Sequence, residues 1–158
     1  MRYHLNFSSG QGVRMRELRT EVKIKASIER VWEVLVDFGN WNEWNPTVKE
    51  INGESSIGSK LMITMIGEDC KEMTYQSVVL ELTPPKIFRW RAKMLADFIF
   101  KNDRIFELEE KEGQTILVHK EEYSGLMVPI SWNKIRQFAL PVLEKMNEAL
   151  KNKIEESS

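Results

Sequence analysis

Six successive segments of alternating apolar and polar residues, followed by one long helical segment, constrain the fold of this chain more than any other feature. The alternating segments lie between residues 47 and 125, and turns containing Gly, Pro or Asp separate most of them. Such alternation indicates strands with one buried face, and short turns between successive strands indicate antiparallel pairing. Residues 131–157 instead repeat apolar side chains at helical spacing. The pattern predicts an antiparallel sheet packed against a long C-terminal helix.

The residues before these six segments add one strand and a short helix. Residues 19–27, RTEVKIKAS, alternate in the same way as the later strands. Ser27 is a suitable N-cap for a helix whose apolar positions begin at Ile28 and recur at helical spacing through Leu35. The element order therefore predicts an α+β fold, in which about seven strands form a curved antiparallel sheet with helices on one face.

Length, charge and cysteine content limit the class of protein. The 158 residues fit one domain, which we place at residues 19–156 after a weakly structured leader at residues 1–18. A formal net charge of -1 gives no broad attraction to polyanions, so we expect no nucleic-acid partner. Cys70 is the only cysteine, and no apolar stretch is long enough to span a membrane. We therefore expect a cytoplasmic monomer or homodimer without integral membrane association.

Motifs for metal, cofactor or covalent chemistry are missing from the sequence. The chain has two histidines, His4 and His119, which are too few for a histidine-rich metal site. It contains no nucleophile elbow, phosphate-binding loop, His-x-x-x-His or Cys-x-x-Cys pattern. We expect neither a metal nor a cofactor.

Three short motifs near the N-terminus resemble a known superfamily. Val31-Trp32, Asp37-Phe38 and Trp44-Asn45-Pro46 match, in order and spacing, the opening of the START-like (SRPBCC) superfamily, specifically its polyketide cyclase/dehydrase and lipid-transport group. Ser27 stands where that family often has proline. Later segments, from RIFELEE through QTILVHKEEYSGLMVPI to MNEALKNKIE, are similar to its last two strands and C-terminal helix. The resemblance spans residues 20–156.

The resemblance implies a helix-grip fold, in which the curved sheet wraps around the C-terminal helix and leaves a cavity for an apolar ligand. The function it implies is binding of a small hydrophobic or amphipathic ligand, such as a lipid, polyketide or isoprenoid. A polyketide cyclase/dehydrase-like acid/base enzyme is one alternative, and an Hsp90 co-chaperone-like protein-interaction domain is another. Because function varies widely within one fold, we favour the non-catalytic ligand-binding protein and leave catalysis open.

Polar residues at Arg104, His119 and Glu121 interrupt the inward, largely aromatic face of the last two strands. A buried polar group without a partner is unfavourable, so these three should meet one another, a water or a ligand. They are an internal ion pair with a hydrogen-bonded histidine, a polar end of a ligand site, or an acid/base catalytic set with His119 as proton carrier. The sequence leaves these three alternatives open.

Aromatic and methionine side chains supply the candidate ligand-binding positions, although any one of them is as well explained by an ordinary core. With the three polar residues included, the candidates are Trp41, Trp90, Phe98, Phe100, Arg104, Phe106, His119, Glu121, Tyr123, Phe138, Val142 and Met146. Within the motif WNEWNP we expect Trp44 to be structural and Trp41 to lie at the cavity mouth. The catalytic candidates, if any exist, are His119, Arg104 and Glu121.

Overall fold

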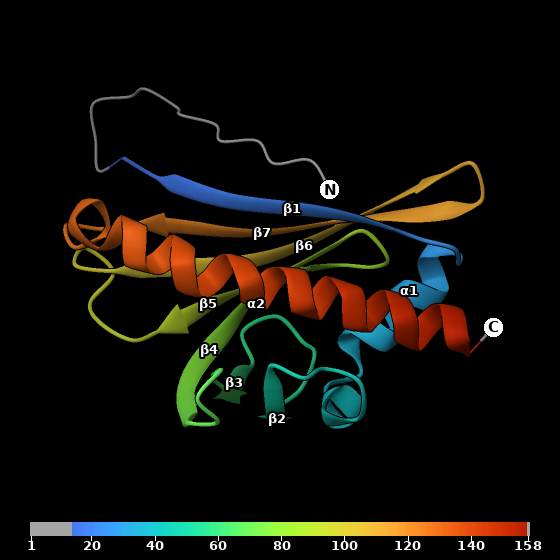
Figure 1. Ribbon diagram of the computed structural model, residues 1–158, viewed down its shortest axis with the longest axis horizontal. Coiled ribbons are helices and arrows are strands. Elements are labelled where there is room, and N and C mark those ends of the chain that lie inside the picture. The colour runs from blue at the N-terminus through green and yellow to red at the C-terminus, as the bar shows by residue number, and fades with distance from the viewer. Residues whose placement is uncertain (1–13, 158) are drawn as a thin grey trace.

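The computed structural model describes residues 14–157, and its elements follow the predicted order (Figure 1). Within those residues the strands are β1 (Arg16–Ile24), β2 (Val48–Asn52), β3 (Lys60–Ile66), β4 (Glu72–Thr83), β5 (Ile87–Lys93), β6 (Lys101–Lys111) and β7 (Gln114–Ser124). The helices are α1 (Ile28–Val36), the 3-10 helix η1 (Phe38–Glu43) and α2 (Val128–Glu156).

The strands form one antiparallel sheet in the order β1-β7-β6-β5-β4-β3-β2. Strands β2 to β7 pair with their neighbours in sequence, whereas β1 closes the far edge by pairing with β7. Figure 1 shows α2 lying across one face of the sheet along the long axis of the molecule, with α1 beside its C-terminal half. This is the α+β architecture that the element order predicted and the helix-grip fold that the resemblance implied.

Two strand boundaries differ from the predicted ones. Strand β1 begins at Arg16 rather than Arg19, and residues 1–13 of the expected leader lie outside the described residues. Strand β6 begins at Lys101, so Phe98 is not a strand residue. The backbone N–H groups of Ile99 and Phe100 both donate to the carbonyl of Ala96, at 2.8 and 3.1 Å, and this turn ends the alternation.

Helices α1 and η1 close one end of the sheet. The Ser27 hydroxyl accepts a hydrogen bond from the Arg30 backbone N–H at 3.3 Å and thereby caps α1, as its position predicted. The apolar side of α1 packs into the largest hydrophobic cluster, together with Phe38 and Trp41 from η1. This end of the molecule is therefore filled by side chains.

Helix α2 runs unbroken through Pro141, which cannot donate a backbone hydrogen bond to residue 137. Its buried side faces β1, β7 and α1 and consists of Val128, Ala139, Leu143, Met146, Asn147, Leu150 and Ile154. None of the described helices is long and apolar enough to cross a membrane. The helix covers the sheet face on which the candidate site residues lie.

Candidate functional site

The inner face of the central strands changes in steps from an aromatic core to a polar, more open end. Cross-strand register aligns three rows on β5, β6 and β7: Phe88, Phe106 and His119; Trp90, Arg104 and Glu121; Ala92, Asn102 and Tyr123. In the first row the Phe106 and His119 rings stack at a centroid distance of 4.3 Å. The second and third rows bring the polar groups together.

Arg104 and Glu121 form an ion pair in the second row. Arg104 Nε and Nη2 donate to the same Glu121 oxygen, Oε1, at 2.7 and 2.5 Å. The other oxygen, Oε2, accepts a hydrogen bond from the Tyr123 hydroxyl. Both charged side chains are buried. Because each charge is paired with the other, neither is left uncompensated in the interior. This is the internal ion pair that the sequence left as one of three alternatives.

The charges of this pair act on the neighbouring tyrosine. Burial, the Glu121 charge and the hydrogen bond to Glu121 raise the pKa of Tyr123 well above its ordinary value. Burial alone would lower the pKa of Arg104, but Glu121 holds it above its ordinary value. Tyr123 is therefore a neutral phenol and Arg104 a permanent cation at neutral pH.

His119 belongs to a separate hydrogen-bonded network with β1 and α2. Its Nδ1 lies 2.9 Å from Asn147 Oδ1, Asn147 Nδ2 donates to Thr20 Oγ1 at 2.8 Å, and Thr20 Oγ1 donates to the His119 carbonyl at 3.1 Å. Because Asn147 uses its amide nitrogen on Thr20, its oxygen faces His119, and Nδ1 carries the proton. Burial and the nearby Arg104 charge hold the pKa of His119 well below its ordinary value, so the ring is neutral.

A pocket of about 150 Å³ lies between α2 and the polar end of the sheet, and we call it the inner pocket. Its lining from the sheet is Met65, Met73, Tyr75, Ala92, Met94, Phe100, Asn102, Arg104, Glu121 and Tyr123. Helix α2 contributes Ile135, Phe138, Ala139 and Val142. The walls are mostly apolar, and the polar groups converge from β6 and β7.

A larger hollow of about 520 Å³ lies outside the inner pocket, between α2 and the turn after β3. Phe138 and Val142 line both spaces, so they form the partition between them. The outer hollow is also bounded by Glu68 and Lys145, which are exposed and form an ion pair at 3.0 Å. Because its rim is solvated and charged, we assign the candidate site to the inner pocket.

Six of the twelve candidate ligand-binding residues line the inner pocket: Phe100, Arg104, Glu121, Tyr123, Phe138 and Val142. Four others, Trp90, Phe106, His119 and Met146, are buried in the packed part of the sheet and helix. Phe98 is 68% exposed in the turn before β6, so the expectation that it points inward is wrong. The four buried residues do not line the inner pocket, so their contact with a ligand remains a prediction.

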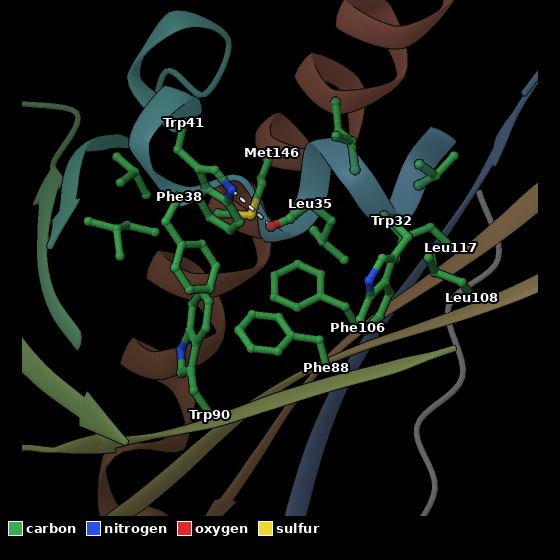
Figure 2. Close-up of a cluster of buried hydrophobic side chains, with 14 of the residues drawn as sticks. Trp32, Leu35, Phe38, Trp41, Phe88, Trp90, Phe106, Leu108, Leu117 and Met146 are labelled. Atoms are coloured by element: carbon green, nitrogen blue, oxygen red, sulfur yellow. Dashed lines mark hydrogen bonds between the residues drawn. The ribbon is translucent and has the colours of Figure 1, made fainter. Parts of the chain in front are cut away.

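Of the two tryptophans of WNEWNP, Trp41 contradicts the expectation, whereas Trp44 packs against the core as expected. Trp41 is fully buried, and its indole Nε1 donates to the Leu35 carbonyl at 3.0 Å. Figure 2 shows Trp41 among Phe38, Trp90 and Phe106 in the core. Trp44 is only half-buried. Trp41 is thus the core residue, because η1 turns it toward the sheet instead of toward a cavity mouth.

Eight lining residues were not among the candidates. Ala92, Met94 and Asn102 continue the inward alternation of β5 and β6, and Met73 and Tyr75 alternate in the same way on β4. Period two could therefore have found them. Met65 follows the same alternation on β3, with Leu61 and Ile63. Ile135 and Ala139 on α2 depend on how the helix crosses the sheet, which the sequence pattern does not give.

No group of three or more His, Cys, Asp or Glu side chains in residues 14–157 is placed to hold a metal ion.

Residues 15–155 match the model of a protein family described as polyketide cyclase/dehydrase and lipid transport. The chain belongs to this family. No curated protein matches its sequence. Membership agrees with the resemblance seen in the motifs around Trp32, Phe38 and Trp44.

Solved structures share the fold of this polyketide cyclase/dehydrase and lipid-transport family member at low identity. The di-domain ARO/CYC protein BexL from the BE-7585A biosynthetic pathway has a TM-score of 0.75 and 16% identity, over 89% of this chain and 50% of BexL. A START superfamily protein from Mycobacterium smegmatis has a TM-score of 0.73 and 17% identity, over 90% of this chain and 99% of that protein.

A third similar structure is a norcoclaurine synthase point mutant from Thalictrum, in complex with a transition-state analogue. It has a TM-score of 0.71 and 15% identity, over 94% of this chain and 99% of that one. The chain spans about half the length of two di-domain ARO/CYC structures, 50% of BexL and 51% of StfQ from the steffimycin biosynthetic pathway. At these identities the likeness shows the fold alone.

Proposed function

We propose that the protein binds a small hydrophobic or amphipathic molecule in the inner pocket, without a covalent step. The observation that carries the proposal is a pocket with apolar walls from β3 to β6 and α2, and a polar floor made by Arg104, Glu121 and Tyr123. Pockets of this kind bind apolar bodies through their walls and orient them through a few polar groups. Family membership supports the same class of ligand.

The proposal does not include catalysis by His119. Its Nδ1 is engaged by Asn147, its ring stacks on Phe106, and it is not a lining residue of the inner pocket. A general acid or base needs to reach the proton that it transfers, either directly or through one water. Arg104 and Glu121 do reach the pocket, and their mutual ion pair suits them to orienting a ligand's polar end.

A thermal-shift screen of lipids, aromatic polyketides and isoprenoid quinones tests the proposal. A ligand at 100 times its Kd should stabilise the protein by about 2.7 kcal/mol. Ala92→Phe should abolish this shift, because Ala92 is a small side chain in the pocket lining and a phenyl ring there fills the pocket. Ala96→Phe is the matched control, since Ala96 is exposed in the turn before β6.

Two results would contradict ligand binding in this pocket. One is no stabilisation by any compound of the three classes. The other is a shift that survives in Ala92→Phe, which would place the binding site elsewhere.

A further inference from the structure

Asn102 lies at the floor of the inner pocket and has a buried amide nitrogen without a hydrogen-bond partner. In the third cross-strand row it pairs with Ala92 on one side and Tyr123 on the other. Asn102 is itself a lining residue of the pocket, with the small side chain of Ala92 beside it, so a ligand that fills this end of the pocket lies against the Asn102 side chain. A buried donor without a partner is unfavourable, and a ligand that supplies an acceptor relieves that penalty.

The other polar groups of the floor already have partners. Glu121 accepts from Arg104 through one oxygen and from Tyr123 through the other. Arg104 directs two of its donors to the same carboxylate. Among the fully buried side-chain nitrogen and oxygen atoms of the residues that line the pocket, the Asn102 Nδ2 is therefore the donor without a partner.

The charge and size of the pocket restrict the ligand further. Arg104 and Glu121 neutralise each other, so a ligand with a net charge would be desolvated there without a counter-charge of its own. A dry cavity of about 150 Å³ in another protein holds one benzene molecule, and the inner pocket, at about 150 Å³, is of that size. The space suits one ring and short substituents.

We propose that the inner pocket selects a neutral, ring-sized group that carries a hydrogen-bond acceptor such as a carbonyl oxygen, and that Asn102 Nδ2 donates to this acceptor. The inference rests on the proposed ligand-binding function and names the chemical class of the part of the ligand that reaches the floor. Asn102 is thus a specificity-determining residue, whereas the apolar walls supply affinity without distinguishing a ketone from a hydrocarbon.

Three ring compounds of similar size test the selection by titration calorimetry: ethylbenzene, acetophenone and benzoate. Acetophenone presents a neutral acceptor, ethylbenzene has none, and benzoate adds a charge. We expect acetophenone to bind the wild-type protein roughly tenfold more tightly than ethylbenzene, as one hydrogen bond to an otherwise unpaired donor implies. Benzoate should bind more weakly than acetophenone.

Variants then assign the preference to Asn102. Asn102→Leu keeps the side-chain size and should bind the two neutral compounds equally, whereas Asn152→Leu, on the exposed end of α2, should keep the tenfold ratio. Ser77→Ala is a stricter control, because Ser77 Oγ is also buried and unpaired in the same row but does not line the pocket. If Asn102→Leu does not fold, Asn102→Ala also removes the donor, adds no charge and should likewise lose the ratio.

The outcomes separate this inference from the function on which it rests. Equal binding of acetophenone and ethylbenzene by the wild-type protein overturns the role of Asn102 while ligand binding stands. A ratio that persists in Asn102→Leu, or disappears in Ser77→Ala, also overturns it. Binding of none of the ring compounds, when a larger compound from the screen does bind, overturns the ring-sized class. Binding of no compound in either experiment rejects the proposed function itself.

Discussion

Arg104 and Glu121 face each other directly across β6 and β7, and two nitrogens of the arginine converge on a single carboxylate oxygen at 2.7 and 2.5 Å. Their side chains are 6% and 3% exposed, respectively. Removal of one member would leave the other as an unpaired charge in the interior, which is far more costly than the loss of the pair itself. The pair therefore stabilises the fold only as a unit.

We expect Glu121→Leu to lower the free energy of unfolding by about 3–5 kcal/mol, because the Arg104 charge loses its partner. The double variant Arg104→Met/Glu121→Leu should recover most of this loss, since it buries apolar groups of similar volume. Urea unfolding of the wild type, both single variants and the double variant measures the coupling. Losses that simply add in the double variant would mean that the two residues act independently.

Trp41 should be more important for stability than Trp44. Trp41→Ala removes a fully buried indole and leaves the Leu35 carbonyl without its side-chain donor, so the expected loss is about 3–5 kcal/mol. Trp44 is half-buried, and Trp44→Ala should cost about 1–2 kcal/mol. Thermal or urea unfolding of both variants gives the comparison. A larger loss of stability in Trp44→Ala than in Trp41→Ala would contradict the assignment of Trp41 to the core.

Alternation was enough to predict which side chains face inward. A strand turns successive side chains to opposite faces whatever their neighbours are, so Phe88, Trp90, Glu121 and Tyr123 could be assigned to the inner face before any contact was known. The same rule failed at Phe98, because a turn ended the strand there.

The position of the pocket along that face could not be predicted. It depends on how far α1 and η1 cover the sheet, which is a contact between distant parts of the chain. Trp41 enters the core from η1 and contacts the Trp90 and Phe106 rings, and this end of the face is therefore filled. The open space lies instead beside Ala92 and Asn102, which were not among the predicted ligand contacts.

His119 should make stability depend on pH below neutrality. Its pKa lies well below the ordinary value in the folded state, first because of burial and second because of Arg104. In the unfolded chain it titrates near pH 6.5, so at lower pH the unfolded state binds a proton that the folded state does not. The stability is complete above about pH 6.5 and falls as the pH decreases, with a slope approaching about 1.4 kcal/mol per pH unit.

Urea unfolding between about pH 7.5 and 5 measures this slope, and His119→Gln should remove it. His4→Gln is the control, because His4 is the other histidine of the chain and its variant isolates the part of the slope that belongs to His119. A slope that is the same in His119→Gln and in the wild type would mean that the histidine is not held neutral.

Gly125 should link the stability of the fold to the position of Phe100 in the lining of the inner pocket. Its φ is 122°, and a Cβ at this position would lie 2.4 Å from the Ile99 carbonyl oxygen and 2.8 Å from the Phe100 backbone nitrogen. Gly113 also has a positive φ, 73°, but a Cβ there meets nothing within 4 Å. Both Gly→Ala variants therefore incur about 1–2 kcal/mol of backbone strain, and only Gly125→Ala adds a steric clash.

Because Phe100 lines the inner pocket, displacement of its backbone in Gly125→Ala should also weaken ligand binding, whereas Gly113→Ala should leave it unchanged. Urea unfolding gives the stability difference, and titration with acetophenone gives the change in affinity. Equal losses of stability in the two variants would show that the contact with Ile99 relaxes without cost. A normal affinity in Gly125→Ala, despite a larger loss of stability, would show that the turn before β6 does not set the position of the Phe100 side chain in the pocket.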